Sequence, residues 1–415
     1  MKTTELIRKI ESGALDTIFV KLYGKADAEG QKARYIRTIK NFEADYGVDR
    51  DVSLFSVPGR SEISGNHTDH NHGCVLAAAI NLDIIAVAAK NSDGLVRLRS
   101  EGYSEDRMTV AECAKPNSDY FFKSRALIAG MVQGFVNYGH KAGGFDAFTT
   151  NNVHKGSGLS SSAAFEVMVG NIINHFYNDG SVDNAEVARI AQFSENEYFG
   201  KPCGMMDQLI CAVGGVVSAD FADPQAPQYR KIEYDFAESG HALAIIECGA
   251  GHENLTADYA QITKDMRLIA VDLGHERLCE ATAAEFYSVF PLLRQKYGDR
   301  PVFRAMHFFE ETRRAAEEAN ALSAGNFEEF LRLYRESAES SEQYLQNIVS
   351  ENEPTHRLAN AISAARNILS GAGAVRVHGG GFAGTAQAFV PEEMKQKFSK
   401  EMQSAGFSCL WPEIV

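Results

Sequence analysis

The spacing of apolar and polar residues along the 415-residue chain predicts alternating helices and strands. Residues 1–46 mix charged and apolar side chains at helical spacing. Strand-like alternation follows at 84–89 and 95–99, and a helix is then predicted in which Leu127, Met131 and Phe135 share one face. Residues 145–153 look extended and lead into a long, apolar-faced helix. This part of the chain is therefore expected to alternate strand and helix.

The rest of the chain is predicted to be mainly helical, with strands at both ends. A strand at 243–248 comes first, helical spacing runs from about 256 to 369, and strands return at 375–378 and 386–390. Two prolines, Pro224 and Pro227, interrupt the pattern and place a domain boundary between 225 and 240. Because the chain is longer than one hydrophobic core usually supports, we expect two domains, 1–235 and 236–415.

Composition and charge exclude several classes of protein. The chain has 41 basic and 55 acidic residues, a net charge of -14, and no basic stretch dense enough to bind nucleic acid. Its seven cysteines are scattered without a C-x-x-C pair, which is typical of reduced thiols in the cytosol. No apolar run approaches the roughly 18 residues of a membrane span, and no export signal is evident. We expect a cytoplasmic protein without nucleic-acid or membrane partners, and no feature of the sequence indicates an oligomeric state.

A glycine- and serine-rich segment runs into the helix that begins near residue 160. Its residues are Gly156, Ser157, Gly158, Leu159, Ser160, Ser161 and Ser162. The free N–H groups and positive dipole of a helix start bind anions, and glycine lets the backbone approach them closely. Serine hydroxyls can bind phosphate oxygens or magnesium. No Walker lysine follows, so an ordinary P-loop is excluded; a merely capped helix start remains the alternative.

A second segment, 58–73, collects charged and amide side chains among turn-forming residues and is predicted to be a functional loop. Its polar residues include Arg60, Glu62, Asn66, His67, Asp69, His70 and His72. Because carboxylates accept strongly from hydroxyl groups, the segment suits a sugar. Two alternatives stay open: a structural turn capped by Asp69, and a metal site of His67, Asp69 and His70. The metal site would lack the preceding histidine of such loops, since Gly65 stands there.

Two further segments could contribute to a site. HGGGFAG at 378–384 formally satisfies G-x-G-x-x-G, but a strand rather than a helix is predicted after it, so a dinucleotide fold does not fit. A glycine bend that closes on another loop fits better. Residues 194–209 supply Glu195 and Asp207 as candidate acids, although either could be an ordinary helix-end or surface carboxylate.

Taken in order, these motifs resemble those of the galactokinase family of the GHMP kinase superfamily over most of the chain. PGRSEISGNHTDHNHG from Pro58 is similar to the family's P-G-R-x-N-x-x-G-E-H-T-D-Y-N-x-G, and HKGSGLSSSA from His154 is similar to P-x-G-x-G-L-S-S-S-A. CGMMDQ from Cys203 and GGGFAG from Gly379 resemble C-G-I-M-D-Q and G-G-G-F-G-G. The resemblance implies an α+β, two-domain fold with the active site in the cleft between the domains.

The resemblance also implies a sugar kinase that uses ATP and Mg²⁺ to phosphorylate the anomeric hydroxyl of galactose. By this resemblance Asp207 and Arg60 flank the reacting hydroxyl, and Ser162 and Glu195 hold magnesium. Residues 156–162 cradle the ATP phosphates. The sugar-contacting positions are Asn66, His67, Asp69, Tyr259, Gly380 and Gly381.

The sequence departs from these motifs at several positions. Asn66 stands where the family has a glutamate, so one negative charge is missing there. The other changes are Glu62 for asparagine, His70 for tyrosine, His154 for proline and Ala383 for glycine. Galacturonic-acid kinases also lack that glutamate and carry a histidine at position 70. The alternatives are therefore a kinase for galacturonate or N-acetylgalactosamine, and a non-catalytic sugar sensor. The glycine- and serine-rich segment 156–162 (the serine segment) is intact, which disfavours the sensor.

Overall fold

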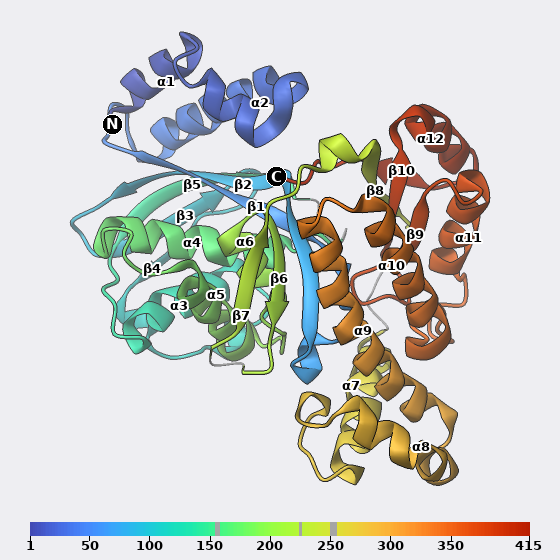
Figure 1. Ribbon diagram of the computed structural model, residues 1–415. Coiled ribbons are helices and arrows are strands. Elements are labelled where there is room, and N and C mark those ends of the chain that lie inside the picture. The colour runs from blue at the N-terminus through green and yellow to red at the C-terminus, as the bar shows by residue number, and fades with distance from the viewer. Residues whose placement is uncertain (154–157, 224–225, 250–254) are drawn as a thin grey trace.

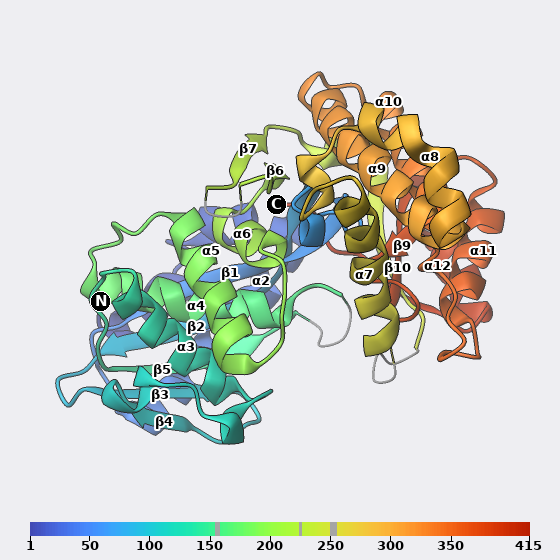
Figure 2. The same cartoon turned by 90° about the horizontal axis from the view of Figure 1, so that it is seen from below.

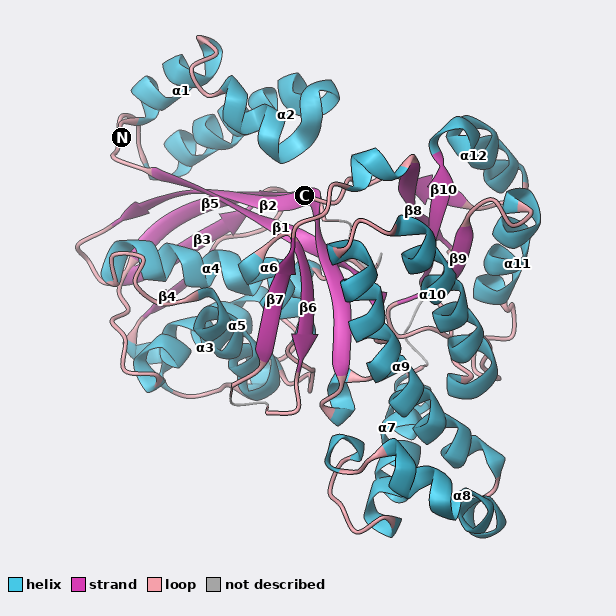
Figure 3. Ribbon diagram, viewed as in Figure 1, coloured by secondary structure: helices cyan, strands magenta, loops and turns pink. Residues whose placement is uncertain are grey.

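The computed structural model describes residues 1–153, 158–223, 226–249 and 255–415. Two β-sheets and the helices packed on them make up the molecule (Figures 1 and 3). The first sheet has the order β4-β3-β5-β2-β6-β7, with β1 paired to β2. Its strands are β1 Ser53–Ser64, β2 Cys74–Lys90, β3 Leu95–Ser100, β4 Asp106–Thr109, β5 Phe145–Asn151, β6 Val216–Asp220 and β7 Gln228–Ile232.

Strand β2 organises the first sheet because it is long enough to pair antiparallel with β1, β5 and β6. Its residues alternate between the two faces, as a strand requires. Ile85, Val87 and Ala89 pack with the N-terminal helices, α1 Thr3–Glu11 and α2 Asp16–Tyr46. Ile84 and Ala86 pack on the opposite face with α3 Ser124–Asn137 and α4 Ser161–Tyr177. The sheet is therefore buried between two layers of helices.

The second sheet is antiparallel, with the order β11-β8-β10-β9. Its strands are β8 His241–Glu247, β9 Ala374–His378, β10 Thr385–Pro391 and β11 Ser408–Leu410. Its outer face packs on α11 Arg357–Leu369 and α12 Lys395–Ser404. Its inner face shares a core with α9 Asp299–Ser323 and α10 Phe327–Ser340, and that core continues into the first sheet.

Helices α7 Thr256–Asp272 and α8 Ala283–Tyr297 pack with α9 in a separate cluster at one end of the molecule. Seen from below, α3–α6 lie on one side and α7–α12 on the other (Figure 2). On the first side, α5 Asn184–Phe193 continues into the π-helical turn η4 Ser194–Phe199, and α6 Met206–Val213 follows. The short 3₁₀ segments include η1 Asp69–Asn71, η2 Ala111–Ala114, η3 Ser118–Tyr120 and η6 Leu278–Glu280, and a second π-helical turn is η7 Ser341–Leu345.

The structure confirms the predicted α+β class and the predicted helices and strands, and it corrects one expectation. Segment 58–73 is not a loop throughout, because its first part, to Ser64, belongs to β1 and is buried. Arg60 and Glu62 are therefore strand residues, and only the part from Gly65 onward turns. The sheets change between β7 and β8, while the C-terminal Val415 donates from its backbone to Ala79 of the first sheet. The division at 235/236 stays a prediction.

Helix α12 and strands β6 and β7 were not predicted from the sequence. Among the described residues, no helix is both long and apolar enough to cross a lipid bilayer.

Candidate active site

Two distant motifs meet where Arg60 on β1 contacts Asp207 in the first turn of α6. The Arg60 Nε donates to Asp207 Oδ1 at 2.8 Å, and Nη2 lies 2.7 Å from the same oxygen. Arg60 is only 6% exposed. Burial acts to raise the pKa of Asp207, but the Arg60 guanidinium and the Ser160 hydroxyl hold that pKa below its usual range. The carboxylate is therefore ionised at neutral pH.

The serine segment lies against this pair. Ser160 directly precedes α4 with φ 58°, and its hydroxyl donates to Asp207 Oδ2 instead of capping the helix. Arg60 Nη1 donates to Gly158 O, and the Arg60 backbone donates to Leu159 O at 3.1 Å. The N-terminal N–H groups of α4 thus have no side-chain cap from Ser160, which is the arrangement that binds anions.

Ser162 and Glu195, the predicted magnesium ligands, lie next to each other. Ser162 Oγ is 3.3 Å from Glu195 Oε1, and Gln208 Nε2 donates to Glu195 Oε2 at 2.8 Å. Lys201 Nζ lies 3.1 Å from Glu195 Oε1. The carboxylate is thus oriented by an amide and already attracts a cation.

Sequence reasoning missed Lys201 and a second carboxyl group, Glu166. Glu166 is fully buried on α4, and Gln208 donates to it at 3.3 Å. Burial and the neighbouring Glu195 charge raise the pKa of Glu166 well above its usual range. Neither residue belongs to a recognisable motif, so only the fold brings them to this place.

The glycine bend between β9 and β10 closes on segment 58–73 (the sugar segment), as expected. Three consecutive carbonyls of the bend face side chains predicted to contact sugar. Asn66 Nδ2 donates to Gly379 O at 2.6 Å, His67 Nε2 lies 2.8 Å from Gly380 O, and the Tyr259 hydroxyl donates to Gly381 O at 2.9 Å. Burial lowers the pKa of His67 to about 3, so the ring is neutral and Nε2 carries its proton.

Asp69 and His70 line a neighbouring cavity of about 280 Å³. Asp69 packs so closely on Gly204 that a Cβ there would lie 2.1 Å from Asp69 Oδ2. Arg277, from the segment before η6, donates through Nη1 to His70 O at 3.0 Å and also lines this cavity. Within the described ranges, Arg277 forms no ion pair with a carboxylate. No motif predicts an arginine here, because 207 residues separate Arg277 from His70.

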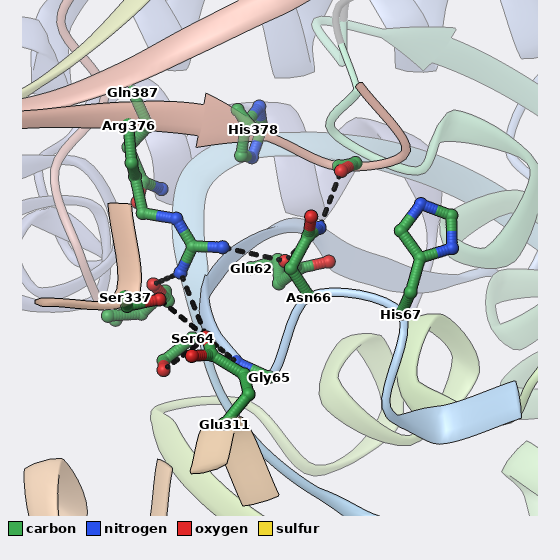
Figure 4. A network of polar contacts seen from close by, with 12 residues as sticks. Glu62, Ser64, Gly65, Asn66, His67, Glu311, Ser337, Arg376, His378 and Gln387 are labelled. Carbon is green, nitrogen blue, oxygen red and sulfur yellow. Dashed lines mark hydrogen bonds and ion pairs between the residues drawn. The ribbon is translucent and has the colours of Figure 1, made fainter. Parts of the chain in front are cut away.

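Beneath the sugar segment, Glu62 lies beside the fully buried Arg376 of β9 (Figure 4). Glu62 Oε1 accepts from Asn66 Nδ2 at 2.8 Å and lies 3.6 Å from Arg376 Nη2. Arg376 Nη1 donates to Ile63 O at 2.6 Å. The polar network therefore joins β1 of the first sheet to β9 of the second.

The structure thus brings most of the predicted site residues together, at the junction of the two sheets. Gly156 and Ser157, predicted to bind phosphate, and the departure at His154 lie outside the described residues. The alternative of a metal site at His67, Asp69 and His70 gains no support. The described part of the chain holds no group of three or more His, Cys, Asp or Glu side chains placed to bind a metal.

Comparisons with known proteins show which proteins this chain resembles. Residues 126–215 match the GHMP kinases N terminal domain, and residues 40–90 match the galactokinase galactose-binding signature. A galactokinase of Clostridium tetani is 29% identical over 88% of this chain and 90% of its own length. The chain is therefore similar to galactokinases of the GHMP kinase superfamily over most of its length.

Solved structures of sugar and mevalonate kinases have a similar fold. The Lactococcus lactis galactokinase complexed with galactose superimposes with a TM-score of 0.78, at 23% identity over 92% of this chain and 98% of that one. The Methanococcus jannaschii mevalonate kinase reaches a TM-score of 0.63, at 15% identity over 88% of this chain and 99% of that one. The expected α+β, GHMP-kinase-like fold is therefore confirmed.

Proposed function

We propose that the protein is an ATP-dependent galactokinase that transfers the γ-phosphoryl group of ATP to the anomeric hydroxyl of galactose, releasing galactose 1-phosphate and ADP. The observation that carries this proposal is the ion pair between the buried Arg60 and the partly exposed Asp207, which the serine segment contacts directly. The two similar proteins named as galactokinases, from Clostridium tetani and Lactococcus lactis, support galactose as the sugar.

In this mechanism Asp207 accepts the proton of the sugar hydroxyl as the oxygen attacks phosphorus. Its lowered pKa makes it a weak base, so it removes the proton late and mainly stabilises charge. Arg60 holds the carboxylate and offers positive charge to the phosphoryl oxygens. Positioning and electrostatics therefore supply most of the rate enhancement.

Mg²⁺ would be held by Ser162 and Glu195 and would neutralise charge on the ATP phosphates. The residues fit this ion, because magnesium in kinases binds through one or two carboxylates together with substrate phosphates and water. The Lys201 ammonium lies 3.1 Å from Glu195 Oε1, which supports a negative charge on this carboxylate. Residues 158–162 would contact the phosphates at the start of α4, together with Gly156 and Ser157.

A cavity of about 480 Å³ suits the adenine base. Its lining combines apolar and aromatic side chains with polar ones; the former are Met108, Tyr120, Ala126, Ala129 and Tyr198. Tyr198 lies on the same π-helical turn, η4, as Glu195, so a nucleotide could reach from this cavity to the serine segment.

A cytoplasmic location, expected from the scattered cysteines, stays a prediction.

Galacturonate is the second candidate substrate. Two observations favour it: residue 66 is an amide, and Arg277 lies beside His70 without a carboxylate partner in the part of the chain described. Galactose remains first, because both named galactokinase relatives point to it.

A coupled assay of ADP release tests the proposal. The purified protein is mixed with MgATP and, in turn, galactose, N-acetylgalactosamine, galacturonate or no sugar, and Asp207→Asn is run in parallel. Galactose-dependent ADP release that the variant lacks is the expected result. ADP release with none of these sugars would instead favour the non-catalytic sensor.

A further inference from the structure

Asn66 is almost fully buried, with 1% of its surface exposed, and the protein itself uses its hydrogen-bonding groups. Its Nδ2 donates to Glu62 Oε1 at 2.8 Å and to Gly379 O at 2.6 Å. Its Oδ1 accepts from Asn347 Nδ2 at 2.7 Å. Both amide hydrogens therefore bond to protein acceptors, and neither is available to a substrate.

The three contacts of Asn66 come from three separate parts of the chain. Glu62 lies on β1, Gly379 opens the glycine bend after β9, and Asn347 follows the π-helical turn η7. Asn347 also donates to Gly380 O at 3.1 Å, and its own carbonyl accepts from the Phe382 backbone at 2.5 Å. Asn66 thus sits at the point where the sugar segment and the glycine bend are held together (Figure 4).

Glu62 is matched to an amide at position 66. Its carboxyl group is 5% exposed, has Arg376 Nη2 at 3.6 Å, and needs a donor to satisfy Oε1. Asn66 supplies that donor. A carboxylate at position 66 has no N–H group, so neither Glu62 Oε1 nor Gly379 O would receive a hydrogen bond from it. It would also repel the Glu62 carboxylate, whose oxygen lies 2.8 Å from Asn66 Nδ2.

The family motif carries the same two groups at exchanged positions, asparagine where this chain has Glu62 and glutamate where it has Asn66. We propose that Glu62 and Asn66 act as one exchanged pair: Glu62 orients the Asn66 amide, and Asn66 holds the glycine bend against the sugar segment. Asn66 is then a positioning residue, and the sugar meets no carboxylate at this position. This inference rests on the proposed kinase function and adds a determinant of sugar binding to it.

A double-mutant cycle of Glu62→Asn and Asn66→Glu tests the pair in the full-length protein. We expect Asn66→Glu to lower the thermal midpoint and to raise the KM for the sugar by about tenfold or more, as loss of two buried hydrogen bonds implies. The KM for ATP should change less than threefold. The double variant, which restores an amide and a carboxylate in contact, should recover most of both losses.

The isosteric Asn66→Asp variant keeps the proposal testable if Asn66→Glu does not fold. It removes the donor with almost no change of shape, and a raised sugar KM at unchanged ATP KM is expected. A merely structural role would lower the active fraction and kcat without changing the sugar KM. Additive effects in the double variant, or an unchanged sugar KM in Asn66→Asp, would overturn the proposal. If the wild type phosphorylates no sugar, the proposed function fails, and coupling in the thermal midpoints alone decides whether the pair exists.

Discussion

Arg60 holds Oδ1 of Asp207 with two nitrogens, Nε at 2.8 Å and Nη2 at 2.7 Å, although 147 residues separate the two in sequence. The other carboxylate oxygen, Oδ2, contacts the Ser160 hydroxyl. Oδ2 is therefore the oxygen that can turn to a sugar hydroxyl during catalysis, while Oδ1 stays fixed by the guanidinium.

The first prediction follows from this division of roles. Asp207→Asn keeps the shape of the side chain and removes its charge, so kcat should fall by about 10²- to 10⁴-fold while the protein stays folded. Steady-state kinetics and circular dichroism measure the two quantities. Arg60→Lys should also be severe, because a single ammonium cannot place two donors on one carboxylate. Glu401→Gln on exposed α12 is the control, and a kcat within tenfold of wild type for Asp207→Asn would remove Asp207 from the mechanism.

Much of this arrangement could be predicted from the sequence, because Arg60, Asp207 and the serine segment each lie in a recognisable motif. Helical and strand periodicity likewise gave the main elements. The polar residues and glycines of segment 58–73 predict a loop there. In the structure, ion pairs and hydrogen bonds between buried groups allow Arg60 and Glu62 to occupy a buried strand.

Other site residues could not be predicted because they act only through long-range contacts. Arg376, Arg277 and Asn347 lie more than 200 residues from the sugar segment and belong to no motif used to find the site. Lys201 falls between two motif residues, yet its role depends on the π-helical turn that brings it to Glu195. Spacing along the chain carries no information about such contacts.

The second prediction concerns magnesium. Ser162→Ala and Glu195→Gln each remove an oxygen donor at the start of α4, so the magnesium concentration needed for half-maximal activity should rise by about tenfold or more. Titration of MgCl₂ at fixed ATP measures this concentration. Ser404→Ala is the control: it removes an exposed hydroxyl at the end of α12 and should leave the magnesium requirement unchanged. An unaltered requirement in both test variants would show that the metal lies elsewhere.

The third prediction is a pH dependence of stability. Burial outweighs the attraction of Arg376 and Arg60 and raises the pKa of Glu62 from 4.5 to about 7, with a smaller repulsion from Asp69. Between pH 4.5 and 7 the folded protein therefore binds more protons at this group than the unfolded chain does. The contribution of Glu62 to the free energy of unfolding should fall as pH rises through this window, by up to about 3 kcal/mol.

Urea unfolding of wild type and Glu62→Gln between pH 4.5 and 8 checks this sign. Glutamine keeps an acceptor for Asn66 but cannot titrate. The free energy of unfolding of the variant should therefore rise relative to that of wild type as pH rises. Parallel curves for the two proteins would mean that Glu62 titrates alike in the folded and unfolded states.

The fourth prediction concerns Arg277. If a uronate is accepted, its carboxylate needs a cation, and Arg277 in the cavity shared with Asp69 can supply one. Arg277→Gln should therefore lower kcat/KM for galacturonate by about tenfold and leave kcat/KM for galactose within twofold. An equal loss for both sugars would assign Arg277 a structural role through its hydrogen bond to His70.

The last prediction concerns the choice of sugar and uses the exchanged pair. On the proposal that position 66 faces the outer carbon of the sugar, a carboxylate there should repel the carboxylate of a uronate. Asn66→Glu alone does not isolate this effect. It also places a second carboxylate beside Glu62 and removes the hydrogen bond to Gly379 O. The Glu62→Asn/Asn66→Glu variant keeps an amide and a carboxylate in contact and moves the charge toward the substrate.

In this double variant the ratio of kcat/KM for galactose over galacturonate should rise relative to wild type. The expected change is about 1 to 3 kcal/mol if the two carboxylates approach closely, which corresponds to roughly 5- to 150-fold. Glu62→Asn alone is the control, since it removes the buried charge without adding one at 66. If the ratio in the double variant equals that of wild type, residue 66 does not face the outer carbon of the sugar, and specificity must then depend on other groups such as His67 and Arg277.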